Sequence, residues 1–368
     1  MLTTEEYKAT YLALNVCVNA RVPVILWGPP GQGKTSVIKA IAENSGRHIE
    51  ILLASIREPQ DFAGLPSISN GRAQLVSPDW ALRLAEDGNG ILFTDEVNTA
   101  PPTVQAALLR VCLDKVAGDC ELGERTSIIA AANPPEQAAD GWDLAAPLAN
   151  RFCHLDWSLP SEVVRDGLSG IWPSFELQNI DPAEAEAFVQ SEKLSVAGFL
   201  TSRPDLTTSL PQSSSEQGRA FPTPRSWEAA AVLSGWVSAL QLDESVRRIL
   251  VRGAIGQAAS AEYLSYRSNL DLPAPAEVLA NPSGFPIPKR ADQVYVIGAG
   301  VLARVRNEPS KDNWTNAGVV LERFATAGNP DIAVSLARDW IKLRPEGVSP
   351  DGGVLNALVP LLKEAKLI

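Results

Sequence analysis

The hydrophobic pattern of the first 157 residues alternates between two kinds of segment. Short aliphatic, β-branched runs predict buried strands, and stretches with apolar positions every three or four residues predict helices. The predicted strands are 22–27, 49–53, 90–94, 127–131 and 152–157, and the predicted helices are 34–43 and 104–112. This alternation favours an α/β fold, a five-stranded parallel sheet with helices on both faces.

An insertion at about 55–80 separates the second and third predicted strands. Its centre places Asn70-Gly71 between two short strand-like arms within residues 67–76. That dipeptide is typical of a tight hairpin turn, because both turn positions need a positive φ. The insertion therefore predicts a β-hairpin.

After residue 160 the strand pattern fades and helical periodicity dominates. Helices are predicted at 182–196, 224–240, 243–266, 290–305, 313–326, 330–342 and 353–366. The Ser-, Thr- and Gln-rich segment 207–218 predicts a mobile loop. The proline-rich segment 272–289 predicts an extended connection. An all-α region is thus expected to follow the α/β core.

Composition narrows the class of protein. The 368 residues include 43 acidic and 32 basic side chains, a net charge of -11, which disfavours tight binding to a nucleic-acid backbone. The four cysteines form no CxxC pair and the two histidines lie far apart, so neither a zinc site nor a redox dithiol is predicted. Scattered thiols, no secretory signal pattern and no long apolar run predict a cytoplasmic protein without membrane contact.

The strongest chemical signal follows the first predicted strand. Residues 28–35 match the phosphate-binding pattern GxxxxGK[ST], and a helix is predicted directly afterwards. In that context backbone N–H groups and the helix N-terminus surround phosphates, Lys34 adds a positive charge, and Thr35 offers a hydroxyl to Mg²⁺. The predicted ATP-binding residues are Gly28, Pro29, Pro30, Gly31, Gln32, Gly33, Lys34, Thr35 and Ser36.

A second signal is the pair of acids that ends the third predicted strand. Asp95 and Glu96 follow the apolar run 91–94. Two carboxylates at a buried strand end are costly unless a cation or water needs them. We therefore predict that Asp95 holds Mg²⁺ together with Thr35, and that Glu96 polarises the attacking water.

Together these motifs resemble those of AAA+ ATPases. The resemblance rests on residues 28–35, the pair 95–96 and the run 128–134. The insertion and residues 99–109 and 221–225 narrow the resemblance to the MoxR group, which belongs to the AAA+ clade with an insert in its second helix. It is close over 20–160, moderate to about 305 and unsupported beyond. It implies a P-loop NTPase core, Mg²⁺-dependent ATP hydrolysis and a helical lid.

The resemblance also implies roles for three polar residues. Asn133 would be the first sensor and orient the lytic water; the alternative is an ordinary Asn-Pro turn. Arg151 would reach the neighbouring subunit's γ-phosphate; the alternative is a solvated arginine at a helix end. Arg225 would be the second sensor and contact the γ-phosphate of its own chain; the alternative is a solvent-facing arginine. Ser55 falls where the family often places a switch residue that touches the catalytic Glu, but a plain loop serine is as good an interpretation.

The same resemblance implies an organisation in four segments. These are an AAA+ core over 1–158, connecting helices and a mobile loop over 159–224, a lid with the second sensor over 225–310, and a helical extension over 311–368. It further implies a homo-oligomeric ring, most often a hexamer, and chaperone-like action beside a partner with a von Willebrand factor A domain. The alternatives are a nucleotide-gated scaffold with slow turnover and, less favoured by the acidic charge, a nucleic-acid motor.

Overall fold

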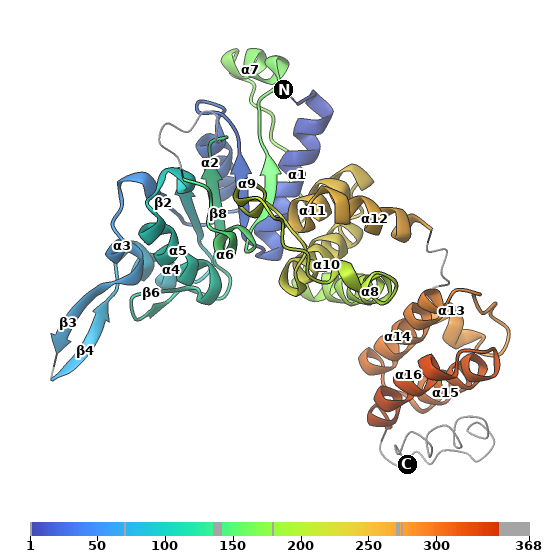
Figure 1. Ribbon diagram of the computed structural model, residues 1–368. Helices are drawn as coiled ribbons and strands as arrows, with labels where there is room; N and C mark the ends of the chain where they lie inside the picture. The colour runs from blue at the N-terminus through green and yellow to red at the C-terminus, as the bar shows by residue number, and fades with distance from the viewer. Residues whose placement is uncertain are drawn as a thin grey trace. The chain divides into compact units, whose positions relative to one another are not determined.

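The computed structural model describes residues 2–69, 71–134, 142–178, 180–269, 273 and 275–345, and it divides into two compact units (Figure 1). The chain up to Val189 and Leu206–Ala261 form the first unit. Gln190–Asp205 and the described residues from Glu262 onward form the second. The four-segment organisation, with its boundaries near 158, 224 and 310, stays a prediction.

A five-stranded parallel sheet forms the centre of the first unit, as predicted. Its strands are β1 (Val24–Trp27), β2 (Ile49–Leu53), β5 (Ile91–Asp95), β8 (Ser127–Ala132) and β9 (Cys153–Asp156). They pair in the order β2-β5-β8-β1-β9, with every pairing parallel. Because β1 lies next to β8 and one strand away from β5, the segments that follow these three strands meet at one edge of the sheet.

Alternate side chains of the central strands enter two separate hydrophobic cores. In β1, Val24 and Leu26 pack on one face, and Ile25 and Trp27 on the other. The first face is covered by α1 (Thr4–Ala20), α2 (Lys34–Asn44), α7 (Ser161–Leu168), α10 (Pro224–Ala239) and α11 (Glu244–Ile255). The second is covered by α3 (Gln60–Ala63), α4 (Asp79–Asp87), α5 (Pro102–Asp114) and α6 (Ala146–Ala149). Burial on both faces explains the nearly continuous apolar runs of the strands.

Helix α1 was missing from the sequence prediction, although its start carries a clear signal. Thr3 accepts a hydrogen bond from the Glu6 amide, and the Glu6 carboxylate accepts one from the Thr3 amide, which is a complete capping box. Its apolar residues are buried almost all round, so they lack the one-sided periodicity of a surface helix.

Two antiparallel hairpins accompany the main sheet. The predicted insertion hairpin is β3 (Leu65–Ser69) paired with β4 (Arg72–Val76), and β6 (Val116–Ala117) pairs with β7 (Cys120–Glu121). The β3–β4 hairpin, drawn in blue in Figure 1, extends away from the main sheet. It carries exposed apolar side chains, among them Ile68 at 81% exposure.

The second unit is helical. Its helices include α13 (Pro275–Ala280), α14 (Ala291–Asn307), α15 (Lys311–Thr326) and α16 (Pro330–Lys342). Trp314 and Trp340 join α15 to α16: their rings stack with centroids 4.4 Å apart, and each indole N–H donates to the other residue's carbonyl, at 3.0 and 2.8 Å. The second unit therefore has its own buried core.

Three predictions for the segments after residue 200 need correction. The predicted helix 243–266 is two helices, α11 and α12 (Gln257–Ser268), because Gly256 has φ 82° and breaks the helix. The predicted extended segment 272–289 contains α13, which begins at Pro275, a position where proline suits a helix. The predicted loop 207–218 contains the short helix α9 (Ser214–Gln217), capped by Ser213.

Other helix predictions need a smaller change or no change. The predicted helix 182–196 continues as α8 (Pro182–Ser202), and the predicted helices at 224–240, 290–305, 313–326 and 330–342 are present as α10, α14, α15 and α16. The predicted helix 353–366 lies outside the described residues.

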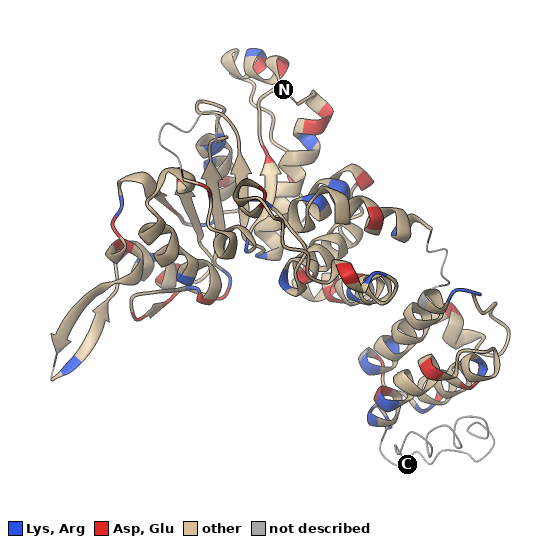
Figure 2. Cartoon of the chain, in the orientation of Figure 1, with Lys and Arg blue, Asp and Glu red and all other residues tan. Residues whose placement is uncertain are grey.

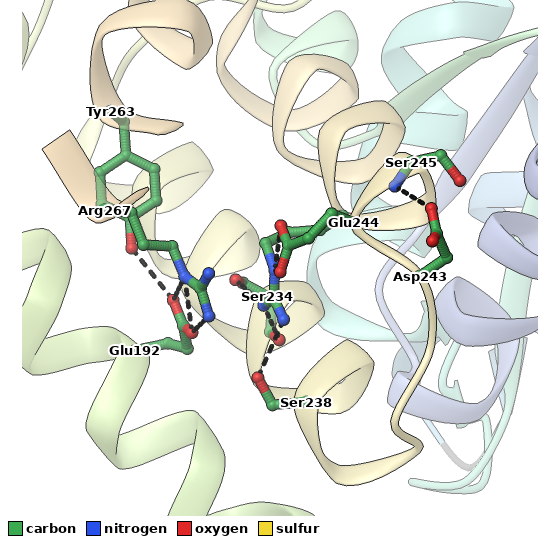
Figure 3. Close-up of polar contacts among 9 residues, drawn as sticks. Glu192, Ser234, Ser238, Asp243, Glu244, Ser245, Tyr263 and Arg267 are labelled. Atoms are coloured by element: carbon green, nitrogen blue, oxygen red, sulfur yellow. Dashed lines mark hydrogen bonds and ion pairs between the residues drawn. The ribbon is translucent and has the colours of Figure 1, made fainter. Parts of the chain in front are cut away.

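Basic and acidic side chains are interspersed along the helices (Figure 2). One arginine, however, is buried: Arg247 of α11 is 4% exposed and is bonded to Glu244 and to Ser234. Figure 3 draws this cluster, and it also draws the bonds that Glu192 makes with Tyr263 and Arg267 within the second unit. No helix in the described part of the chain is long and apolar enough to cross a membrane.

Candidate nucleotide-binding site

The loop between β1 and α2 has the backbone shape that phosphate binding needs. Gly31 and Gly33 have φ values of 77° and 68°, a region that disfavours other residues. A Cβ atom on Gly28 would lie 2.2 Å from the carbonyl oxygen of Trp157, so only glycine fits there. Helix α2 begins directly after the loop and directs its free N–H groups and positive dipole end into it.

Gln32 fixes this loop to the segment that follows β9. The Trp157 indole N–H donates to the Gln32 carbonyl at 2.9 Å, and the Leu159 amide donates to the Gln32 side-chain oxygen at 2.9 Å. The sequence motif leaves this position open to any residue, so only the structure identifies what Gln32 does.

Lys34 lies at the centre of the polar cluster. Its Nζ donates to the carbonyls of Gly28 and Pro29 and, at 3.2 Å, to Oδ1 of Asn133. Burial lowers the pKa of Lys34, while the nearby carboxylates of Asp95 and Glu96 act in the opposite direction. An ammonium held by neutral oxygens in this way is ready to exchange them for phosphate oxygens.

Asp95 and Thr35 lie together in the folded chain, and their role in holding Mg²⁺ stays a prediction. The Thr35 hydroxyl donates to Oδ2 of Asp95 at 3.2 Å, although the residues come from α2 and the end of β5. A hydroxyl and a carboxylate are hard oxygen ligands, the kind that Mg²⁺ prefers. Among the described residues, no group of three or more His, Cys, Asp and Glu side chains could hold a metal ion. A Mg²⁺ ion at Thr35 and Asp95 would thus need further oxygens from phosphate and water.

Glu96 has an unusual backbone conformation. Its φ of 55° and ψ of 41° are left-handed, which costs a residue other than glycine about 1 kcal/mol or more. The carboxylate accepts a hydrogen bond from the Ser55 hydroxyl at 2.7 Å. An ordinary loop role for Ser55 was as good an interpretation from the sequence, and the structure shows its contact with the predicted general base.

Asn133 is oriented by a residue that the sequence analysis missed. Asn98 donates to the Asn133 carbonyl at 2.8 Å and accepts from the Asn133 amide at 3.1 Å, so the two residues are paired in both directions. Asn98 is 2% exposed. The only signal in the sequence is a polar residue three positions after Asp95, which many surface turns share.

Arg151 and Arg225 form a second cluster. Nη1 of Arg151 donates to the Pro147 carbonyl at 2.9 Å, and its buried Nε has no hydrogen-bond partner. Burial lowers the pKa of Arg151, and the nearby Arg225 guanidinium lowers it further. Arg225 is exposed on the first turn of α10. Neither arginine forms an ion pair within the described ranges, although the Asp114 carboxylate acts on Arg151 electrostatically and opposes the lowering of its pKa.

A family model identifies the class of this site. Residues 23–152 match the AAA domain of the dynein-related subfamily. This segment contains the phosphate loop, both acids, Asn133 and Arg151. Over these residues the chain is similar to an AAA domain.

Curated relatives agree with this assignment. Protein MoxR of Methylorubrum extorquens is 32% identical over 103 residues, which are 28% of this chain and 30% of MoxR. "Pathogenicity locus probable regulatory protein WtsA" of Pantoea stewartii is 34% identical over 93 residues, 24% of this chain and 29% of that protein. The chain therefore spans about 30% of the length of the curated relatives it matches. The predicted resemblance of the AAA+ core to MoxR is confirmed.

One solved structure, of a protein from Cytophaga hutchinsonii, covers 69% of this chain and 87% of its own, with 18% identity and a TM-score of 0.43. This likeness is too distant to carry a functional argument.

Proposed function

We propose that this chain is a Mg²⁺-dependent ATPase of the AAA+ class that works as a homo-oligomeric ring, of hexameric size, and remodels a partner protein. The observation that carries the catalytic part is the meeting of Lys34, Thr35, Asp95 and Glu96 at one edge of the sheet. They belong to the phosphate loop, α2 and the end of β5, which only the folded topology brings together.

Each residue then has a step that follows from its position. Lys34 and the loop amides bind the phosphates, and Thr35 with Asp95 holds Mg²⁺, which supplies charge neutralisation for the phosphoryl group. Glu96 accepts a proton from the attacking water, and Ser55 holds its carboxylate in place. Asn98 holds the backbone N–H and carbonyl of Asn133, and Asn133 fits the role of orienting that water.

The ring part of the proposal is supported by the unpaired arginines. Arg151 forms no ion pair among the described residues, although Asp114 acts on it electrostatically, and its buried Nε lacks any hydrogen bond. Such a cation would be stabilised by a phosphate that another subunit presents. Arg225 acts on Arg151 electrostatically, which is compatible with a common phosphate target for both arginines as well as with the second-sensor role within the chain that the resemblance implies. A partner with a von Willebrand factor A domain remains what the MoxR resemblance implies.

Two variants test the catalytic assignment. Lys34→Ala should abolish tight ATP binding, measured by calorimetry on protein shown to be folded. Glu96→Gln should bind ATP normally but hydrolyse it on the order of a hundred-fold more slowly. Glu58→Gln, at an exposed acid outside the cluster, is the matched control. Unchanged affinity in the first variant or near-normal turnover in the second would contradict the assignment.

The partner-remodelling part is tested with the same Glu96→Gln chain. If ATP binding prepares the ring for a client, that variant should retain a specific protein in the presence of ATP and release it with ADP. A Lys34→Ala chain should retain none. Equal recovery from both variants would argue against nucleotide-gated binding and for a scaffold that ignores nucleotide.

A further inference from the structure

A cavity of about 710 Å³ lies at the edge of the sheet opposite the nucleotide site. Its lining includes Arg21, which precedes β1, Arg47, which precedes β2, and Arg125, which precedes β8. In a parallel sheet the segments that precede the strands share the amino-terminal edge. Asn44, the last residue of α2, also lines the cavity. Lys34 is the first residue of the same 11-residue helix, so roughly 16 Å of helix separates the cavity from Lys34.

Arg47 is built into the wall of this cavity. Its Nε donates to the Asn89 carbonyl at 2.6 Å, and Nη2 donates to the Gly90 carbonyl at 2.9 Å and to the Ser127 hydroxyl at 2.8 Å. These bonds join the segments before β2, β5 and β8. They satisfy the guanidinium with neutral oxygens and not with a carboxylate.

The neighbouring cations add to this charge. Burial lowers the pKa of Arg47 to about 10, and Arg21 contributes in the same direction. Burial also lowers the pKa of Lys115, again with a contribution from Arg21. Asp87 and Glu124 oppose these effects in part. A cation whose pKa is lowered by neighbouring like charges is held there at a cost in free energy, which an anion would relieve.

Acidic partners do not supply that anion within the described part of the chain. No ion pair in the described part of the chain includes Arg21, Arg47 or Arg125. The C-terminal ends of α1 and α2 face the same edge, but such an end stabilises an exposed cation only weakly. The cavity thus has a basic wall that is available to a ligand.

The remaining walls limit the shape of such a ligand. Tyr11, Phe175 and Trp236 contribute aromatic surface. Glu176 and Asp181 also line the cavity, and they would repel a second anionic group while accepting hydrogen bonds from a ligand's donors. The volume lies within the range of about 300–1,000 Å³ that is usual for small-molecule sites. A fitting molecule therefore carries negative charge at one end and a ring with donor groups at the other.

We propose that this cavity binds a small ring-bearing organic phosphate of the nucleoside monophosphate class, at a site separate from the ATP site. Arg21 and Arg125 contact the phosphate group, and Arg47 holds the segment of Arg125 in place through its bonds to the Arg125 carbonyl and the Ser127 hydroxyl. The ring packs on the aromatic wall, with its donor groups toward Glu176 and Asp181.

The test uses full-length protein carrying Lys34→Ala, so that the phosphate loop does not compete for the probe. Guanosine monophosphate and guanosine are titrated separately by calorimetry. We expect saturable binding of the monophosphate and at least about tenfold weaker binding of guanosine, because the charge-assisted bonds are lost. The double variant Arg21→Gln/Arg125→Gln should weaken monophosphate binding at least about tenfold as well.

Arg72→Gln/Arg110→Gln is the charge-matched control, since both arginines are exposed and neither lines the cavity. Circular dichroism verifies the fold of each variant, and the single Arg125→Gln change at an exposed residue replaces the double variant if that one unfolds. The proposal is overturned if the monophosphate does not saturate at millimolar concentration, if guanosine binds equally well, or if the control loses as much affinity as the cavity variant.

Discussion

At the scale of single residues, the site depends on partners that hold the reactive groups in place. Glu96 carries the general-base assignment, but its left-handed backbone and its bond from Ser55 determine where the carboxylate points. His154 illustrates the same dependence away from the chemistry: its ring stacks on Trp27 and is bonded on both nitrogens.

Ser55→Ala should lower kcat on the order of tenfold, or about 1.4 kcal/mol of transition-state stabilisation, and leave the KM for ATP nearly unchanged. The reason is that the hydroxyl positions Glu96 without touching the phosphates. Steady-state ATPase kinetics measure both constants. Ser169→Ala, whose exposed hydroxyl bonds to the Arg165 carbonyl, should leave both constants unchanged. A rise in KM alone would refute a positioning role.

His154 should make the protein less stable in mild acid. Burial lowers the pKa of its imidazole from 6.5 to about 4. Between these values the unfolded chain binds a proton that the folded chain excludes, so the free energy of unfolding is full above about 6.5 and falls as the pH drops toward 4. Urea unfolding across this window should show a shallower pH dependence in His154→Gln, because the carboxylates titrate alike in both proteins. An identical slope would contradict the assignment.

At the scale of elements, the connection from β1 to α2 is determined by what lies against it. Gly28 is enclosed by the Trp157 carbonyl, whereas Gly31 has no atom within 4 Å of an added Cβ. Two glycines of one motif therefore serve different purposes: the first allows close packing and the second allows a positive φ.

Gly28→Ala should destabilise the fold by about 2 kcal/mol or more and abolish ATP binding, because the new methyl group would overlap backbone that does not move easily. Gly31→Ala should cost only about 1–2 kcal/mol, the cost of a left-handed alanine. Chemical denaturation and calorimetric titration with ATP would compare the two variants. Equal stability losses would show that packing against Trp157 is not the constraint at Gly28.

At the scale of the whole molecule, mixing two inactive chains tests the ring. Arg151→Ala chains keep Glu96, and Glu96→Gln chains keep Arg151, so mixed rings contain sites with both groups if Arg151 acts on a neighbour. Partial recovery of ATPase activity is expected. Subunit exchange is verified independently with labelled chains, and exchange without recovery would count against action across the boundary.

The same design decides where Arg225 acts. An Arg225→Ala chain mixed with Glu96→Gln should recover activity if Arg225 shares the target of Arg151. It should recover none if Arg225 serves the site of its own chain, because every mixed site then lacks one group. ATPase rates of the two mixtures, measured in parallel at equal ring concentration, distinguish these cases.

The sequence by itself determined the sheet, the phosphate loop and the acid pair. Strands buried on both faces produce continuous apolar runs, and phosphate binding needs glycines and a lysine at fixed local spacing, so both leave a signal within a few residues. For the same reason the hairpin formed by β3 and β4 was predicted from the Asn70-Gly71 dipeptide and its strand-like flanks.

Only the tertiary structure decided which partners complete the site. Ser55 reaches Glu96 across 41 positions, and Asn98 reaches Asn133 across 35. The order β2-β5-β8-β1-β9 brings such pairs together, and no local pattern records it. The sequence likewise did not reveal the end of helix α11 at Gly256 or the cavity beside Arg21 and Arg47. Both depend on contacts between segments that are distant in the chain.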